Sequence, residues 1–276
     1  MTFKKEQFAK KYFSLDNKIV VVTGGTGILG SLYCHRLAEA GARVVISDLR
    51  QDLCEKLASK INRNFSGRAI PLVFDLANET SVISWAKSIT EEIGVVDVIV
   101  NNAATKSKNF FAPLDSFSLD DWNHVMAVNL TGMFLVIREL GTKMASAGHG
   151  SIINISSIYG VVGPDQRIYD GSWYSDVGGT INTPLVYSAS KGAVISMSRY
   201  LATYWGRNGV RVNVLTPGGV LSGQNETFKT KYSNRVPMGR MANSEEMVGA
   251  LLFLASDASS YITGQNIIID GGWTAW

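Results

Sequence analysis

A tyrosine and a lysine four positions apart, Tyr187 and Lys191, are the residues of this sequence best suited to proton transfer. Side chains at this spacing share one face of a helix. A phenol has an ordinary pKa near 10, and a neighbouring ammonium group stabilises the phenolate and lowers that pKa. The pair could thus act as a general acid and base near neutral pH. Because the chain has 10 tyrosines, chance alone predicts about half of one such pair. The residues around the pair must therefore show whether it is functional.

The elements that must position this pair are short β-branched runs alternating with longer segments of helical spacing. The expected strands cover residues 19–22, 44–46, 70–74, 95–100, 152–155, 210–215 and 267–269. The expected helices cover residues 29–40, 53–61, 82–93, 122–144, 189–205 and 247–254. This alternation predicts an α/β fold, a doubly wound parallel sheet of about seven strands with helices on both faces. Ligands of such sheets bind beyond the carboxyl ends of the strands.

Composition limits the classes of function. A chain of 276 residues with 46% hydrophobic residues suits one domain over residues 1–276, with an N-terminal extension at 1–17. The formal net charge of +3 and the lack of long basic runs indicate neither nucleic acid nor a membrane surface as a partner. Two cysteines, Cys34 and Cys54, and three scattered histidines predict no disulfide framework and no metal site. Without a signal core or a run of about 18 apolar residues, a cytoplasmic protein is expected.

A glycine-rich turn follows the first expected strand. It contains Gly24, Gly27 and Gly30, and a helix begins directly behind it. Missing side chains let backbone N–H groups approach a pyrophosphate, and the helix N-terminus adds the positive end of its dipole. We therefore expect a dinucleotide to contact this turn, with an ordinary tight turn as the alternative. The cofactor contacts expected here are Gly24, Thr26, Gly27, Ile28, Leu29 and Gly30.

Acidic residues end the second and third expected strands. The Asp48 carboxylate, followed by Leu49, can accept hydrogen bonds from ribose hydroxyls and would repel a 2′-phosphate. NAD is therefore favoured over NADP, although Arg50 could turn towards a phosphate instead of lying in solvent. Asp75, followed by Leu76, suits a contact to adenine or a cap on the next helix.

Further polar and small residues lie where strands end or inside the long central helix. They are Asn102, Ala103 and Ala104 after the fourth strand, Asn129, Ser157 after the fifth strand, and Pro217 and Gly218 after the sixth. In this order, these segments resemble the short-chain dehydrogenase/reductase superfamily from residue 19 to residue 272. The resemblance implies a single-domain Rossmann fold and an enzyme that transfers hydride between NAD(P)(H) and a secondary alcohol or ketone.

The resemblance also implies roles for individual residues. Tyr187 exchanges a proton with the substrate oxygen, while Lys191 lowers the phenol pKa and holds the nicotinamide ribose. Ser157 orients the substrate, and Asn129 holds a water that links Lys191 to solvent. The alternatives are that Ser157 caps a helix and that Asn129 is a buried asparagine with its hydrogen bonds satisfied. Further expected cofactor contacts are Asn102, Ala103, Ala104, Tyr187, Lys191, Pro217, Gly218, Val220 and Ser222, the last at the carboxamide.

Two features depart from the family pattern. The spacing of Gly24, Gly27 and Gly30 is that of longer, extended members. Ser157 and Tyr187 are also further apart than usual, so residues 160–186 resemble an insertion beside the substrate pocket. Tyr169 and Tyr174 lie in this insertion and are alternative catalytic tyrosines, but neither has a lysine four residues later.

The insertion suggests a substrate class. It is expected to bring Asp165, Gln166, Arg167, Tyr169, Asp170, Trp173, Tyr174 and Asp176 near the pocket. Aromatic faces mixed with hydrogen-bonding groups suit a sugar, polyol or sugar acid, and Arg167 could pair with a carboxylate or phosphate. Alternatively, the loop packs at a subunit contact. The insertion also resembles oxidoreductases of flagellin-modification and nonulosonic-acid pathways. Residues 218–241, with Met238 and Met241, are a candidate lid.

Two other functions remain open. A sugar epimerase or dehydratase on this fold would regenerate its cofactor in each turnover, but such enzymes carry an added C-terminal substrate domain, and the sequence stops at Trp276. A non-catalytic nucleotide sensor would keep the fold without the chemistry. The family resemblance implies a homodimer or homotetramer, in which the aromatic tail, residues 273–276, would lie at a contact or over a neighbouring pocket.

Overall fold

Seven parallel strands form one sheet in the order β3-β2-β1-β4-β5-β6-β7. The computed structural model describes residues 8–173 and 180–276. The strands are β1 (Ile19–Thr23), β2 (Arg43–Asp48), β3 (Ala69–Val73), β4 (Val98–Asn101), β5 (Gly150–Ile155), β6 (Val210–Pro217) and β7 (Asn266–Ile269). This order is that of a Rossmann-type sheet, and it confirms the predicted fold class.

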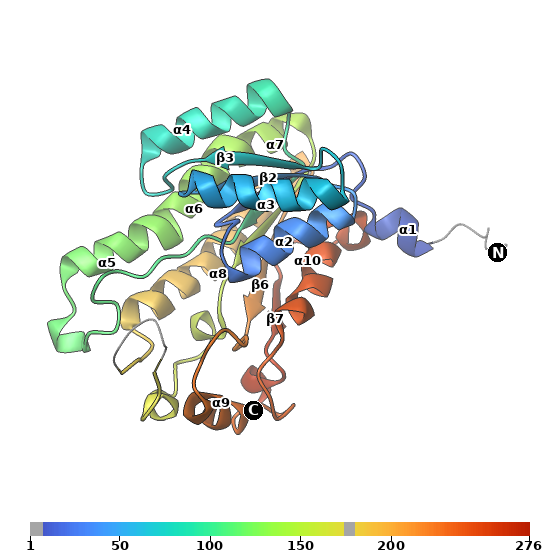
Figure 1. The fold of residues 1–276 in the computed structure, drawn as a ribbon. Coiled ribbons are helices and arrows are strands. Elements are labelled where there is room, and N and C mark those ends of the chain that lie inside the picture. Colours follow the sequence, from blue (N-terminus) through green and yellow to red (C-terminus); the bar gives the residue numbers. More distant parts are fainter. Residues whose placement is uncertain (1–7, 174–179) are drawn as a thin grey trace.

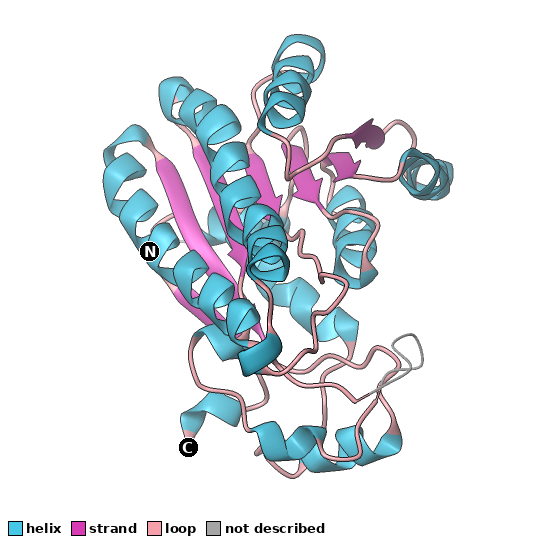
Figure 2. Cartoon of the chain, turned by 90° about the vertical axis from the view of Figure 1, so that its left-hand side faces the viewer, coloured by secondary structure: helices cyan, strands magenta, loops and turns pink. Residues whose placement is uncertain are grey.

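Helices cover both faces of this sheet, as the edge-on view in Figure 2 shows. The α-helices are α1 (Phe8–Phe13), α2 (Ile28–Glu39), α3 (Gln51–Asn64), α4 (Glu79–Ser88), α5 (Leu119–Met126), α6 (Met133–Val136), α7 (Thr142–Ala147), α8 (Leu185–Trp205), α9 (Glu226–Ser233) and α10 (Val248–Ala255). π-Helical turns join α5, α6 and α7 into one helical run. Helices α2, α3 and α10 pack on one face, and α4, α8 and this run pack on the other.

The strands explain why the sheet has two cores. Neighbouring side chains of a strand point to opposite faces, so Val21 belongs to one core while Val20 and Val22 belong to the other. All three are fully buried. Strands buried on both faces have continuous apolar runs, which is the pattern that made them recognisable.

The helical run from Leu119 to Ala147 is long and apolar enough to cross a membrane by length and composition alone. Half of its apolar window is buried inside the protein. Met133, Val136 and Leu140 of this run pack against the sheet. Its apolar character is therefore explained by its place in the core.

Three differences from the predicted elements bear on the site. Helix α8 begins at Leu185, because Pro184 takes the N-cap position, so Tyr187 lies inside the first turn. Strand β4 begins only at Val98, after Gly94 has ended the preceding helix with a φ of 126°. The candidate lid contains helix α9, which the sequence analysis missed.

A third, smaller core lies beyond the carboxyl ends of the strands. Tyr169 of the insertion, Phe228 and Tyr232 of α9, and Trp273 near the C-terminus belong to it. The Tyr232 and Trp273 rings stack with centroids 4.4 Å apart. Figure 1 shows α9 and the C-terminus together below β6 and β7. This layer covers the edge of the sheet at which ligands of such folds bind.

Candidate active site

Two cavities open at the carboxyl edge of the sheet. The first, about 500 Å³, is called the glycine-turn cavity, and the second, about 650 Å³, the tyrosine cavity. Ala104 and Thr105 line both, so the two cavities meet there. The glycine-turn cavity is lined by Gly24, Thr26, Gly27, Ile28, Leu29, Gly30, Asp48, Leu49, Phe74, Asp75, Leu76, Asn102, Ala103, Ala104, Thr105 and Val128. Thirteen of the expected cofactor contacts are therefore brought together in one place.

The glycine-rich turn is held close to β4. Gly24 has a φ of 62°, and a Cβ atom there would lie 2.7 Å from the Cα atom of Ala103. A Cβ atom at Gly30 would collide with the Gly24 carbonyl oxygen. The Asn102 Nδ2 donates to the carbonyl oxygens of Thr23 and Gly24, at 3.1 and 3.0 Å. Glycines are therefore required for the packing of the turn itself.

The start of α2 fits a bound anion. Its N-cap is Gly27, so no side chain caps the first N–H groups of the helix. These groups adjoin the open glycine-turn cavity, and unpaired N–H groups at a helix start are the usual partners of a phosphate. The turn can therefore hold the pyrophosphate of a dinucleotide.

The Asp48 carboxylate is fixed at the edge of the glycine-turn cavity. Its Oδ2 accepts hydrogen bonds from the backbone N and the Oγ1 of Thr26, at 2.9 and 2.7 Å, and its Oδ1 accepts from the Leu49 N at 2.7 Å. Arg50 instead pairs with Asp52 at 2.7 Å, with both side chains largely exposed. Thr26 and Leu49 therefore hold the Asp48 carboxyl group in place beside the cavity, and the nearby arginine is directed to another partner.

Asp75 lines the same cavity but does not cap the following helix. Asn78 caps α4 by accepting a hydrogen bond from the Ser81 N. The Asp75 Oδ1 accepts from the Ala77 N at 2.9 Å. The capping alternative for Asp75 is therefore wrong, and the contact to adenine stays a prediction.

The predicted proton-transfer residues come together at the tyrosine cavity. Ser157 and Tyr187 both line it. Lys191 lies one turn further along α8, only 3% exposed, with its Nζ 2.9 Å from the Ile155 carbonyl oxygen and 5.9 Å from the Tyr187 ring centroid. Ser157 also accepts a hydrogen bond from the Tyr159 N, so it caps a short 3₁₀ turn as well.

The short 3₁₀ turn after Ser157 packs closely on α8, and this close packing depends on a glycine. A Cβ atom at Gly160 would lie 2.6 Å from the Lys191 carbonyl oxygen, so only glycine lets the turn pack so closely on α8. The Ser156 Oγ donates to the same oxygen at 2.8 Å. The segment after β5 is thereby fixed against α8, which places Ser157 near Tyr187.

Burial lowers the pKa of Lys191 to about 8 from its ordinary 10.5. At pH values between these two pKa values, the unfolded chain binds more protons at Lys191 than the folded protein does. The free energy of unfolding of the cofactor-free protein should therefore rise with pH across this window, by up to about 3 kcal/mol. Urea unfolding at a series of pH values measures this rise, and Lys191→Met should lose it. Parallel curves for the two proteins would contradict the assignment.

Asn129 lies behind the cavity wall and does not line it. It is fully buried in the π-helical turn before α6. Its Oδ1 accepts from the Thr105 N at 2.9 Å, and its Nδ2 lies 3.4 Å from the Ser190 Oγ. The Ser190 Oγ donates to the Tyr187 carbonyl oxygen. Asn129 therefore ties the segment after β4 to the first turn of α8, and its predicted water contact stays a prediction.

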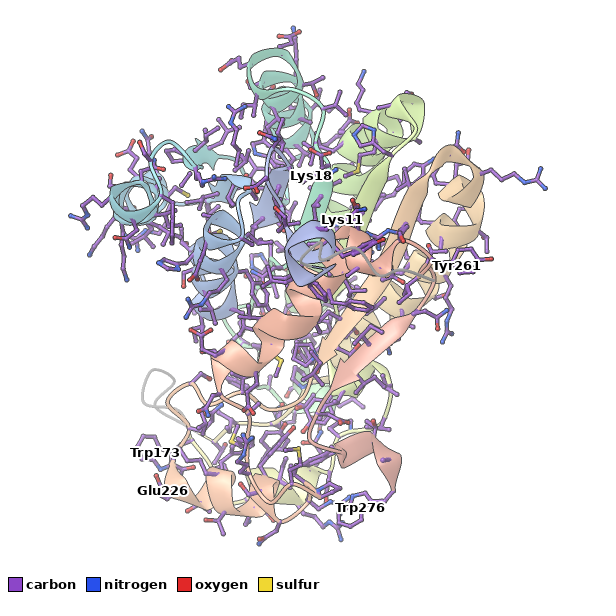
Figure 3. All side chains as sticks on the ribbon, turned by 90° about the vertical axis from the view of Figure 1, so that its right-hand side faces the viewer. Lys11, Lys18, Trp173, Glu226, Tyr261 and Trp276 are labelled. Carbon is purple, nitrogen blue, oxygen red and sulfur yellow. The ribbon has the colours of Figure 1, made fainter. Side chains whose placement is uncertain are left out.

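Most polar residues of the insertion do not reach the cavity, which corrects the expectation for this segment. Tyr169 does line it, and its hydroxyl bonds to those of Tyr159 and Thr183. Arg167 instead pairs with Asp165, and its side chain is 80% exposed. Of the insertion residues that were expected near the pocket, those that do not line the tyrosine cavity are Asp165, Gln166, Arg167, Asp170 and Trp173. Trp173 lies at the outer surface in Figure 3. Tyr174 and Asp176 lie outside the described residues.

The physical reason is that the insertion uses these polar groups to hold its own shape. Asp165 caps the 3₁₀ turn Gln166–Tyr169 and also pairs with Arg235 at 3.0 Å. Only the apolar side of this turn, with Ile168 and Tyr169, packs inward.

Other residues that line the tyrosine cavity were not predicted, among them Thr105, Ile158, Tyr159 and Gly219. The others are Lys106, Phe110, Phe111, Asn182, Thr183, Pro184, Gln224, Phe228 and Tyr232. For Lys106 a signal existed, because it follows Ala104 at the carboxyl end of β4. The α9 residues Phe228 and Tyr232 are spaced four apart, which is a helical signal in a short polar segment.

The candidate lid contributes three of the expected cofactor contacts and one of its two methionines to the tyrosine cavity. Gly218, Val220 and Ser222 line the tyrosine cavity, whereas Pro217 ends β6 beneath it. The Gln224 side chain accepts from the Ser222 N and donates to the Val220 carbonyl oxygen, which fixes this segment. Met241 lines the cavity, but Met238 is 64% exposed.

Comparison with known proteins identifies the family. Residues 18–175 match the family model for short chain dehydrogenase, and residues 172–274 match that for enoyl-(acyl carrier protein) reductase. D-threitol dehydrogenase of Mycolicibacterium smegmatis is 33% identical over 99% of both chains. A gluconate 5-dehydrogenase from Burkholderia cenocepacia, solved with NADP and tartrate, is 33% identical with a TM-score of 0.85, covering 97% of this chain and 99% of that one.

A short chain dehydrogenase from Leptospira borgpetersenii, solved with bound NAD⁺, is 32% identical with a TM-score of 0.85. The match covers 99% of this chain and 98% of that one. Both family models and the full-length relatives thus point to the same family. The chain therefore belongs to the short-chain dehydrogenase family of NAD(P)-dependent oxidoreductases.

Proposed function

We propose that this protein interconverts a secondary alcohol and a ketone on a sugar, polyol or sugar acid, with NAD(H) as its cofactor. The observation that carries the proposal is that Ser157 and Tyr187 line a cavity that meets the glycine-turn cavity, with Lys191 buried beside them. The oxidised cofactor supplies the acceptor for hydride from the alcohol carbon. All other steps fall to side chains of this chain.

In this proposal Tyr187 takes the proton of the substrate hydroxyl as the carbon–hydrogen bond is broken. The Lys191 ammonium stabilises the phenolate that this requires. Ser157 donates a hydrogen bond to the substrate oxygen and holds it near Tyr187. In the reverse direction Tyr187 returns the proton to the ketone oxygen.

The preference for NAD rests on Asp48. An anionic carboxylate at the cavity edge accepts hydrogen bonds from ribose hydroxyls and repels a 2′-phosphate. Thr26 orients that carboxylate, and the Arg50 guanidinium is paired with Asp52. Related structures contain NADP in one case and NAD⁺ in another, so the local charge is the stronger argument.

The substrate class is supported by the tyrosine cavity and by the relatives. The cavity joins the aromatic rings of Phe110 and Phe228 with the polar groups of Asn182 and Thr183. Rings can stack on the C–H faces of a sugar chain while polar groups bind its hydroxyls. One relative is named for a polyol and another for a sugar acid.

The proposal is tested by the absorbance of reduced nicotinamide, with NAD and NADP offered separately and with a panel of sugars, polyols and sugar acids. We expect NAD-linked oxidation of at least one class. Product analysis separates the alternatives, because an epimerase or dehydratase leaves the net redox state of the cofactor unchanged. Cofactor binding without turnover of any compound would favour the non-catalytic sensor.

We also infer association into a homodimer or homotetramer. Tyr200 and Tyr204 on α8 are 65% and 63% exposed, and their rings stack with centroids 5.7 Å apart. Adjacent exposed aromatic rings are typical of a surface that another protein covers. Light scattering should give a multiple of the 30.0 kDa chain mass, and a monomer would count against the inference.

A further inference from the structure

Residues 218–222 form one wall of the tyrosine cavity, and a buried glutamine supports this wall. Gly218, Val220 and Ser222 line the cavity. Ser222 is exposed, whereas Gln224, two residues later, is only 6% exposed. A buried amide group costs free energy unless its hydrogen bonds are satisfied, so its partners show what it stabilises.

Three hydrogen bonds join the Gln224 side chain to this wall. Its Oε1 accepts from the Ser222 N at 2.8 Å. Its Nε2 donates to the Val220 carbonyl oxygen at 2.9 Å and to the Ser222 Oγ at 3.1 Å. These bonds use the carbonyl oxygen and both hydrogens of the amide. Gln224 therefore holds the backbone and the hydroxyl of Ser222 at the same time.

These partners fix which way round the amide group lies. A backbone N–H can only donate, and a backbone carbonyl oxygen can only accept. The Ser222 N must therefore face the Oε1, and the Val220 carbonyl oxygen must face the Nε2. The Ser222 Oγ lies beside the Nε2, so it is the acceptor in this contact. A hydroxyl that accepts from an amide keeps its own proton for another partner.

The backbone around this hydroxyl is also held in place. Gly223 has a φ of 89°, in the left-handed region that favours glycine, and this turn lets the Gln224 side chain reach back along the wall. On the other side, the Leu221 N donates to the Ala242 carbonyl oxygen, and the Ala242 N donates to the Gly219 carbonyl oxygen, both at 2.9 Å. The wall is therefore fixed by hydrogen bonds before and after the serine.

The group that this hydroxyl faces follows from the place of the wall. In the proposed function, hydride leaves the carbon whose hydroxyl gives its proton to Tyr187, so the nicotinamide ring must lie in the cavity that Tyr187 and Ser222 both line. The carboxamide is the polar substituent of this ring, and its carbonyl oxygen is an acceptor. A hydroxyl that keeps its proton matches this oxygen.

We infer that Gln224 is a positioning residue, which makes the Ser222 hydroxyl a hydrogen-bond donor to the carboxamide oxygen of the nicotinamide. The inference rests on the proposed function and adds to it a residue that acts through another. Gln224 takes no part in proton transfer. Changing its hydrogen-bonding groups should therefore weaken the binding of the nicotinamide half of the cofactor and leave the binding of the adenosine half as it is.

The test compares NADH with ADP-ribose, which lacks the nicotinamide, by isothermal titration calorimetry. Gln224→Glu keeps the size of the side chain but replaces the Nε2 donor by an acceptor, so the Ser222 hydroxyl donates to the new carboxylate instead of to the cofactor. NADH should bind about 10-fold more weakly, and the affinity for ADP-ribose should change by less than about threefold. Ser222→Ala should cause a similar loss of NADH affinity.

Two further variants and a control separate the causes of this loss. The double variant Ser222→Ala with Gln224→Glu should bind NADH no more than about threefold more weakly than either single variant, because both changes remove the same donor. Gln224→Met adds no charge and should also weaken NADH binding, since the hydroxyl is then no longer oriented. Gln265→Glu makes the same chemical change at an exposed glutamine outside the lining of both cavities, and it should keep both affinities within about threefold.

Four results would overturn the inference. They are an unchanged NADH affinity in Gln224→Glu, an equal loss of affinity for ADP-ribose, losses that add in the double variant, and a Gln224→Met variant that binds NADH like the wild type. Each of them leaves the proposed function intact if the wild type oxidises a substrate with NAD. A wild type that binds neither ligand would contradict the proposed function, and the inference would fall with it.

Discussion

Tyr187→Phe should lower kcat by at least about 1,000-fold, because the variant keeps the ring but has no hydroxyl to exchange a proton with the substrate. The Phe110 contact and the start of α8 do not depend on that hydroxyl. NADH affinity, followed by fluorescence titration, should therefore change by less than about threefold. Turnover is measured by nicotinamide absorbance with whichever compound the wild type oxidises.

The matched control is Tyr169→Phe. Tyr169 lines the same cavity and also loses only a hydroxyl, but this hydroxyl bonds to Tyr159 and Thr183, and Tyr169 has no lysine one turn later. We expect this variant to keep at least about a tenth of the wild-type kcat. The opposite pattern, an active Tyr187→Phe and an inactive Tyr169→Phe, would transfer the catalytic role to the insertion. Full activity of both would refute the mechanism.

Asp48→Ser should shift the preference between the cofactors, expressed as the ratio of kcat/KM with NAD to kcat/KM with NADP, by at least about 100-fold towards NADP. The substitution removes both the acceptor for the ribose hydroxyls and the negative charge that repels a 2′-phosphate. Asp48→Asn separates these effects, because it keeps an acceptor for Thr26 and loses the charge. Initial rates with each cofactor provide the measurement.

Asp75→Ser serves as the control for this experiment. Asp75 lines the same cavity, but its expected contact is to adenine, which NAD and NADP share. Any loss of kcat/KM in Asp75→Ser should be similar with both cofactors. The ratio of kcat/KM with NAD to kcat/KM with NADP should therefore stay within about threefold of the wild-type ratio. A wild type that already prefers NADP, or an Asp48→Ser variant with an unchanged ratio, would show that Asp48 does not select the cofactor.

The elements of the sheet were predictable because each is encoded by a local pattern. β-Branched runs predicted all seven strands, and the glycines after β1 predicted the turn that packs against Ala103. Helix α9 was missed because its sequence is short and polar. Phe228 and Tyr232 stabilise it through contacts with Tyr169 and Trp273, which lie far away in the sequence. No local pattern reports such contacts.

The candidate site also has a part that the sequence predicted and a part that it did not. The residues that line the glycine-turn cavity follow strands directly, so the topology of the sheet places them. The polar residues of the insertion were placed wrongly, because the side chain that Asp165 binds, Arg235, lies beyond α9. Lys106 was not predicted to line the tyrosine cavity, because its place in a loop after β4 does not show which cavity that loop reaches.

The stacking of Trp273 on Tyr232 has a consequence for the order in which the site is completed. Tyr232 accepts a hydrogen bond from the Gly219 N at the cavity wall, so Trp273 supports that wall through Tyr232. During synthesis the glycine-rich turn leaves the ribosome long before Trp273 does. A nascent chain can therefore form its nucleotide-binding half first, and it completes the wall of the other half only after Trp273 has been made.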